Sequence, residues 1–443
     1  MYPNPQDALP LPSRPDVEQY RKLAKDLVKA CLSEDVTGIH QWATRWLRTL
    51  GSLVEDASAR PTDADMVTLA GQIDRFAREK LRRGGVSGST CKLADAQFVI
   101  ARAHGFSSWP TFVAHLDELP RASSAVSTFE AAADAIVKGD IATLERLLKQ
   151  QPDLVRARSS REHRATLLHY VAANGVENYR QISPKNAAAI TEALLAAGAE
   201  VDAEANVYGG GCTALGLVAT SAPPANAGVQ IEVIDVLLRH GAKMDHNGAA
   251  GNAHALVRGC LANGQPAAAA YLVSRGAPLD LPSAAGLGRL DRVKACLDKD
   301  PELRSNLTGA VVKESFSLAC AYGHQQVVSH FLELGFKADE ELRGHGEGHT
   351  GLHVAAYHGH ADVVETLLRH GAAVDVNDKT WETPPLIWAL TGWKGRPAPD
   401  ARYYEVVERL VGAGATVTPK LLEWDRARED PKMLAALRSR ARL

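Results

Sequence analysis

Residues 350–360 read Thr-Gly-Leu-His-Val-Ala-Ala-Tyr-His-Gly-His, and residues 361–375 continue Ala-Asp-Val-Val-Glu-Thr-Leu-Leu-Arg-His-Gly-Ala-Ala-Val-Asp. The pattern predicts two helices: Thr350 caps the first and Gly359 ends it, and Gly371 ends the second. The second helix carries an apolar stripe with the spacing of one helix face, formed by Val363, Val364, Leu367 and Leu368. Because one such helix pair cannot bury its own apolar face, we expect similar units on either side of it.

This unit resembles the ankyrin repeat, whose Thr-Pro-Leu-His-x-Ala signature is present with Gly351 in place of the proline. Other units align on glycines that end helices near the period of that family: Gly198, Gly241, Gly276, Gly335, Gly371 and Gly414. The resemblance covers about residues 127–418 and implies eight repeats. It therefore predicts an all-α solenoid with β-hairpin fingers between its helix pairs.

Composition and spacing divide the chain into four segments. The proline-rich residues 1–15 predict an extended leader, and apolar periodicity predicts a helical N-terminal domain over 16–120. The ankyrin array over 127–418 is followed by a polar capping helix over 419–443. Residues 92–116 contain a segment similar to one found ahead of ankyrin arrays in bacterial proteins, so the chain is identified as a protein of that bacterial type.

Charge and cysteine content exclude several classes of protein. The chain has 443 residues with 50 basic and 52 acidic side chains, a balance that argues against nucleic acid or an anionic membrane as partner. The six cysteines show no CxxC spacing and are predicted to be reduced thiols. The start of the chain has no signal-peptide pattern and no apolar run has the length of a bilayer span, so we predict a cytoplasmic location.

We predict a binding groove around the sixth to eighth repeats. Tyr322 and His358 occupy the same variable position just before a helix-ending glycine, so both should line the concave face, with Tyr357 beside them. The fingers add His345, His349 and Trp381, and an insertion in the eighth repeat adds Trp393 and Tyr403. Aromatic and imidazole groups around one concavity are typical of recognition sites. The alternative is that Trp393 and Tyr403 only pack the insertion onto its own repeat.

Insertions also enlarge the second and third repeats. Insertions in a solenoid fall on one edge and often mark its binding side. The second repeat adds a segment with Tyr179, and a glycine-rich finger tip carries Tyr208, so both are further candidate binding residues. The alternative is that these segments are solvated loops.

We predict neither a metal nor a cofactor. His353 matches the signature histidine, which in the ankyrin family hydrogen-bonds between neighbouring loops, and His360 follows a helix-ending glycine. The histidines that remain nearby, at 345, 349 and 358, lack the spacing of a zinc site. The chain shows no P-loop, no dinucleotide fingerprint and no Gly-x-Ser-x-Gly motif.

The resemblance implies a scaffold for protein–protein interaction through its concave groove. The alternative is an enzyme or small-molecule-binding protein that uses His349, His358, Glu347 and the aromatic residues near Trp393. A third possibility is a host-directed effector, a role found among bacterial ankyrin proteins.

Overall fold

The computed structural model describes residues 4–12, 14–53, 62–81, 91–245, 253–342, 347–395 and 401–439. Regular structure in these residues is helical apart from one two-stranded ladder, which confirms the predicted all-α class. The chain divides into two compact units, Met1–Ala268 and Ala269–Leu443. Within the described residues, no helix has both the length and the apolarity to cross a bilayer.

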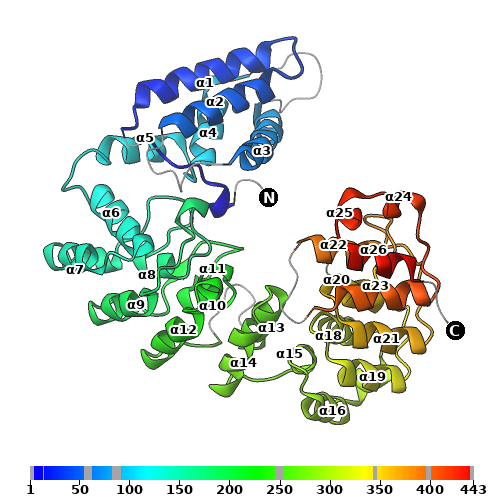
Figure 1. Ribbon diagram of the computed structural model, residues 1–443. Helices are drawn as coiled ribbons and strands as arrows, with labels where there is room; N and C mark the ends of the chain where they lie inside the picture. The colour runs from blue at the N-terminus through cyan, green and yellow to red at the C-terminus, as the bar shows by residue number, and fades with distance from the viewer. Residues whose placement is uncertain are drawn as a thin grey trace. The chain divides into compact units, whose positions relative to one another are not determined.

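Five helices open the first unit: α1 (Val17–Leu32), α2 (Gly38–Leu53), α3 (Asp63–Leu81), α4 (Leu93–Ala103) and α5 (Trp109–Glu118). Helices α1 to α4 pack against one another, and α5 packs on α1 and α4 (Figure 1). The leader contains the 3-10 helix η1 (Pro5–Asp7). Leu9 just behind it is buried, and its backbone N–H donates to the carbonyl of Ala103 at 2.8 Å. The leader is therefore packed onto the helical bundle.

The core of this bundle contains Trp42 and Trp46, which are buried as the sequence predicted. The bundle also contains a disulfide between Cys31 and Cys91, so the prediction that all six cysteines are reduced is wrong for this pair. The two cysteines are 60 residues apart, and no local spacing could reveal that they meet. The free cysteines are Cys212, Cys260, Cys296 and Cys320.

Helix pairs follow in the order that the repeats predicted. They are α6 (Ala125–Lys138) with α7 (Ile141–Gln150), α8 (Leu167–Val171) with α9 (Ala187–Ala196), α10 (Ala214–Ala219) with α12 (Gln230–Arg239), and α13 (Ala253–Ala262) with α14 (Pro266–Ser274). Between them lie η3 (Pro152–Arg156), η4 (Asn178–Arg180), α11 (Ala222–Asn226) and the antiparallel strands β1 (Glu204–Ala205) and β2 (Cys212–Thr213). Helices α6, α8, α10 and α13 form one layer, and α7, α9 and α12 form a second (Figure 1).

The second unit contains four more pairs: α15 (Leu281–Gly286) with α16 (Leu290–Lys299), α18 (Ala310–Ala321) with α19 (Gln325–Glu333), α20 (Gly351–His358) with α21 (Ala361–Arg369), and α22 (Pro385–Gly395) with α23 (Tyr403–Gly412). The short α17 (Pro301–Ser305) precedes α18. The first helices of the pairs lie side by side and the second helices form a layer along them (Figure 1). One hydrophobic cluster fills the space between the layers.

The end of this unit differs from the single polar helix that the sequence predicted. Three short helices lie there: α24 (Pro419–Leu422), α25 (Asp425–Arg428) and α26 (Pro431–Arg438). They bury Ala427, Met433, Ala436 and Leu437 in the core cluster. The apolar side of α26 packs against α23, and the charged side chains of the segment meet solvent.

The signature residues hold neighbouring repeats together. Nδ1 of His353 accepts a hydrogen bond from the backbone N–H of Thr350 at 3.1 Å, and Nε2 lies 3.2 Å from the carbonyl oxygen of Thr383. Nε2 therefore carries the proton, and burial lowers the pKa of His353 to about 4. In the second repeat, His169 makes the same bonds to Thr166 and to the following finger. The bridge between neighbouring loops that the sequence predicted for His353 is present.

Gly392 lies inside α22. A Cβ at this position would overlap the carbonyl oxygen of Tyr357 and approach Cε1 of Tyr403 at 3.0 Å. Helix propensity alone would favour alanine over glycine by about 1 kcal/mol, whereas overpacking costs about 1–3 kcal/mol. The overlap involves the backbone of α20, which cannot move as a flexible side chain could. Overpacking therefore outweighs helix propensity, and the net change in the free energy of unfolding should be destabilising.

We expect Gly392→Ala to lower the free energy of unfolding by about 1–3 kcal/mol, measured by denaturant titration. Gly71→Ala is the matched control, because Gly71 lies inside α3 and a Cβ there meets nothing within 4 Å. That substitution should be neutral or stabilising by up to about 1 kcal/mol. Equal effects of the two changes would show that α20 and α22 are too loosely packed for the overlap to matter.

Candidate functional site

A pocket of about 510 Å³ opens between the first helices of the seventh and eighth repeats. We call it the α20–α22 pocket. Its walls come from both helices and from the finger that precedes α22, and the lining residues are Val354, Tyr357, His358, Trp381, Thr383, Ile387, Trp388 and Thr391. The structure thus brings together three of the predicted site residues: Tyr357, His358 and Trp381.

Trp388 is the centre of this pocket, and the sequence analysis missed it. Its ring centroid lies 5.4 Å from that of Trp381 and 6.1 Å from that of Tyr357, in edge-to-face arrangements. Trp388 itself is 7 % exposed, whereas Trp381 is 58 % and Tyr357 40 % exposed. A buried indole therefore supports two aromatic side chains that reach solvent. Aligning Leu386 with Leu352 places Trp388 in register with Val354, and that alignment is the signal in the sequence.

Asp378 fixes the indole of Trp388 in place. Its Oδ2 accepts hydrogen bonds from Nε1 of Trp388 at 3.1 Å and from the hydroxyl of Thr383 at 2.8 Å, and its Oδ1 accepts one from the backbone N–H of Trp381 at 2.6 Å. Burial alone would raise the pKa of Asp378, but these donors outweigh it and hold the pKa well below its ordinary value. The carboxylate is therefore ionised and organises the finger around the pocket.

Other predicted residues of this unit lie outside the lining. Tyr403 begins α23 and is 4 % exposed, and its hydroxyl donates to the carbonyl of Tyr357 at 3.0 Å. Trp393 is half-buried, and its ring lies 6.0 Å from that of Trp424 in the capping segment. Tyr403 thus contacts the seventh repeat and Trp393 contacts the segment that follows the array, so neither side chain lines the α20–α22 pocket.

The remaining predicted residues of the groove are placed differently. Tyr322 is half-buried at the end of α18, with its ring 6.5 Å from that of His324. His349 is buried, and its ring stacks on Trp388 at 5.7 Å, so it supports the pocket from behind. His345 lies outside the described residues.

The two predicted residues of the first unit make contacts of their own. Tyr208 is 57 % exposed at its finger tip, and its hydroxyl donates to Oδ1 of Asn174 at 2.7 Å. Tyr179 is half-buried, with its hydroxyl 3.4 Å from Nη2 of Arg161, and burial raises its pKa to about 12. Tyr179 thus belongs to an internal polar cluster.

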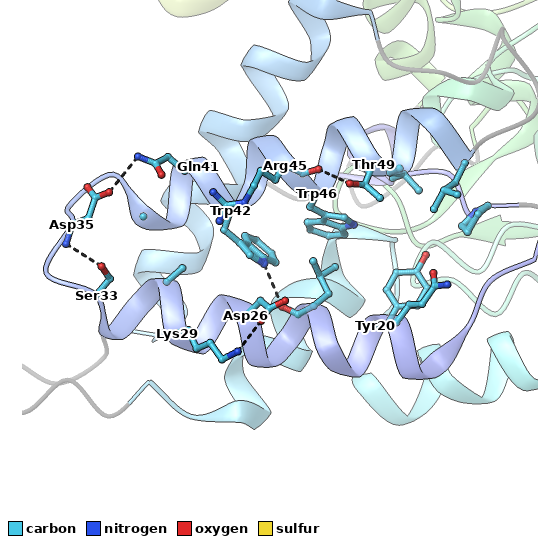
Figure 2. A pocket seen from close by; sticks show the side chains of 17 residues that line it. Tyr20, Asp26, Lys29, Ser33, Asp35, Gln41, Trp42, Arg45, Trp46 and Thr49 are labelled. Carbon is cyan, nitrogen blue, oxygen red and sulfur yellow. Dashed lines mark hydrogen bonds and ion pairs between the residues drawn. The ribbon is translucent and has the colours of Figure 1, made fainter.

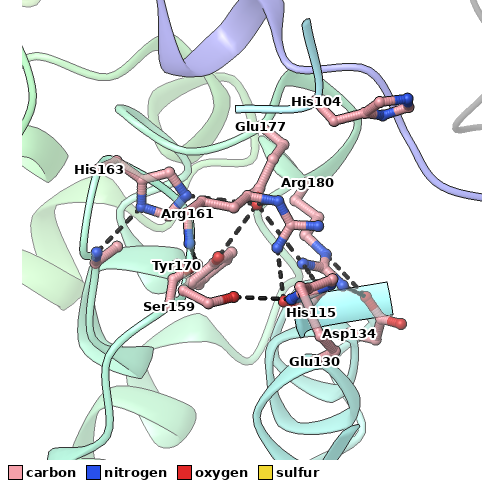
Figure 3. Close-up of polar contacts among 12 residues, drawn as sticks. His104, His115, Glu130, Asp134, Ser159, Arg161, His163, Tyr170, Glu177 and Arg180 are labelled. Carbon is pink, nitrogen blue, oxygen red and sulfur yellow. Dashed lines mark hydrogen bonds and ion pairs between the residues drawn. The ribbon is translucent and has the colours of Figure 1, made fainter. Parts of the chain in front are cut away.

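Buried charged side chains from α6 and from the insertion of the second repeat meet in that cluster (Figure 3). Arg161 pairs with Glu130 at 2.6 Å and with Glu177 at 2.8 Å, and Arg180 pairs with Glu130 at 2.7 Å and with Asp134 at 2.6 Å. Apart from the half-exposed Asp134, these side chains are almost inaccessible to water. Two guanidinium groups face two buried carboxylates, so the cluster is internally neutralised. It ties the insertion of the second repeat to α6 and does not present a free charge to a ligand.

The electrostatics of the cluster follow from this pairing. Burial alone would raise the pKa of Glu130, but the charges of Arg161 and Arg180 prevail and lower it to about 2. The same competition holds the pKa of Glu177 well below its ordinary value, with Arg161 as the main opposing charge. Both carboxylates are therefore ionised near neutral pH.

A second pocket, of about 520 Å³, lies along α1 and α2 in the helical bundle (Figure 2). Trp42 and Trp46 line it but are almost fully buried, and Nε1 of Trp42 donates to the carbonyl of Leu23 at 3.2 Å. At its rim Lys29 pairs with Asp26, and Asp35 accepts hydrogen bonds from neighbouring side chains. None of the candidate binding residues predicted from the sequence lines it.

Across the residues that the structure describes, no group of three or more His, Cys, Asp or Glu side chains is placed to hold a metal ion. The lining of the α20–α22 pocket contains one imidazole, from His358, and no carboxylate. The arrangement therefore offers aromatic and apolar contact surface in place of an acid–base pair.

Comparison with known proteins identifies the type of repeat in part of the chain. Residues 316–420 match a family model described as ankyrin repeats (3 copies). Among solved structures, the chain is similar to the human ASB11 ankyrin repeat domain, with 19 % identity over 65 % of this chain and 99 % of that chain and a TM-score of 0.28. No curated protein matches the chain. Residues 316–420, which include both helices of the pocket, thus carry ankyrin repeats, and such repeats in general form scaffolds for protein interaction.

Proposed function

We propose that this chain is a binding scaffold that holds a protein partner in the α20–α22 pocket. The observation that carries the proposal is the exposure of Trp381 and Tyr357 on opposite walls of a pocket supported by the buried Trp388. Exposed aromatic side chains that are held rigid from below favour tight contact, because little conformational entropy is lost when a partner covers them.

The test uses the loss of this aromatic surface. A tagged full-length chain should capture its partner from an extract of its source cells, and Trp381→Ala combined with Tyr357→Ala should reduce the captured amount at least tenfold. Val67→Ala combined with Leu93→Ala is the matched control, because both are exposed apolar side chains of the other unit and neither is a candidate binding residue. Retained capture by the double variant, with the melting curve unchanged, would contradict the proposal.

A small molecule in the same pocket is the second candidate. The volume of about 510 Å³ falls within the range of ligand pockets, and a mainly aromatic lining with few polar groups is typical of them. Native mass spectrometry of the purified chain separates the two candidates: a bound compound that is lost in the Trp381→Ala variant would favour the small molecule.

The predicted location and source belong to the same proposal. A cytoplasmic, bacterial ankyrin protein that binds neither nucleic acid nor membranes is consistent with its balanced charge. The disulfide between Cys31 and Cys91 weighs against the cytoplasm, because disulfides persist in oxidising compartments. The predicted domain boundary at residues 120–127 also remains a proposal, and contacts cross it: His115 lies 2.8 Å from the hydroxyl of Ser160.

A further inference from the structure

A second concavity adjoins the α20–α22 pocket. It has a volume of about 680 Å³ and lies on the other side of α22, between that helix and α24. We call it the α22–α24 pocket. Its apolar surface includes Pro384, Leu421 and Trp424. Ile387 and Thr391 line both pockets. These two side chains form the ridge that separates the two concavities.

A ligand that covers the ridge does not have to supply a hydrogen-bond acceptor for it. Ile387 and Thr391 are four residues apart, one turn of α22, and the hydroxyl of Thr391 donates to the carbonyl of Ile387 at 2.8 Å. A polar group that is already satisfied by its own helix can be covered at little cost. One ligand can therefore lie across the ridge and occupy both pockets at once.

The two pockets differ in charge. The lining of the α20–α22 pocket contains no Lys, Arg, Asp or Glu. The α22–α24 pocket is lined by Lys394 and Lys420, which are exposed, and by one carboxylate, Asp375. That carboxylate accepts hydrogen bonds from the backbone N–H and the hydroxyl of Thr416, the latter at 2.6 Å. The side-chain charge of this lining is therefore +1.

Both lysines are available to a ligand. In the part of the chain that the structure describes, no ion pair forms at either ammonium group, and Nζ of Lys394 lies 6.0 Å from the ring of Trp424. An acidic group that enters this pocket meets two exposed ammonium groups beside an aromatic wall, and one of them already lies over the ring of Trp424. Charge complementarity at such a site selects between partners of opposite sign.

We propose that the partner of this groove is an extended acidic peptide segment with two large apolar residues, one for each pocket, and an Asp or Glu beside the residue in the α22–α24 pocket. The inference rests on the proposed function and names its partner class. An α-helix is about 10 Å across. An extended chain of the polyproline II type advances about 3.1 Å per residue with three residues per turn, so two apolar residues three apart point to the same side and span about 9 Å.

The probe is a library of random dodecapeptides displayed on phage and selected on the full-length chain. Enriched sequences should share two large apolar residues three or four apart, with an acidic residue next to one of them. A synthetic peptide of that sequence should bind at least tenfold more weakly to Lys394→Glu combined with Lys420→Glu. Lys337→Glu with Lys432→Glu is the control, because it changes the net charge equally at exposed lysines outside both pockets.

Each other outcome overturns the inference. If the enriched peptides depend on Trp381 but tolerate the reversal of Lys394 and Lys420, the acidic two-pocket partner is wrong while the proposed function stands. Enrichment of basic peptides rejects the acidic class of partner. Equal enrichment of the same peptides on the wild type and on the variant with Lys394→Glu and Lys420→Glu rejects it as well. Failure of the proposed function would appear separately, as capture of the cellular partner that survives loss of Trp381 and Tyr357.

Discussion

Replacement of Arg161 by methionine is expected to lower the free energy of unfolding by about 3–5 kcal/mol. The substitution roughly keeps the volume of the side chain but removes the guanidinium that pairs with Glu130 and Glu177. Glu130 keeps Arg180 at 2.7 Å, whereas the nearest remaining guanidinium nitrogen is 3.8 Å from Glu177. A fully buried carboxylate is thus left poorly compensated, and that desolvation cost dominates the effect.

Denaturant unfolding of the full chain, followed by circular dichroism, measures this loss. Arg146→Met is the matched control, because Arg146 is exposed on α7 and should cost less than about 1 kcal/mol. Adding Glu177→Gln to Arg161→Met should restore part of the stability, since it removes the stranded charge. A loss below about 1 kcal/mol for Arg161→Met would mean that the cluster is open to water.

The second large effect is expected for Leu367→Ala, at about 2–5 kcal/mol. Leu367 is 0 % exposed on α21 and belongs to the core cluster between the two helical layers. Truncation leaves a cavity that the close-packed layers cannot refill. Leu368→Ala is a stringent control, because the neighbouring leucine is only half-buried and should cost clearly less.

The same unfolding experiment decides this prediction. A loss for Leu368→Ala that equals or exceeds that for Leu367→Ala would show that α21 is rotated about its axis, with Leu368 in place of Leu367 in the core.

The candidate site was partly readable from the sequence. Trp381 and His358 were found because finger and helix-end positions recur in a repeat, so the register alone places them on one face. Trp388 was missed because its importance lies in four ring contacts, including those with His349 and His353, that no local pattern encodes. Tyr403 was placed on a rim because the bounds of an insertion cannot be read from periodicity.

The helix pairs and their caps follow from the amino-acid sequence alone, and the resemblance to the ankyrin repeat implied the bridging role of His353. These features depend on interactions within one repeat or between consecutive repeats, so a fixed period displays them. The folded chain was needed to reveal that Cys31 meets Cys91, that Arg161 and Arg180 share the buried Glu130, and that Gly392 admits the backbone of another repeat. Each of these depends on atoms brought together from distant parts of the chain. Their cost or benefit arises only when packing excludes water from between them.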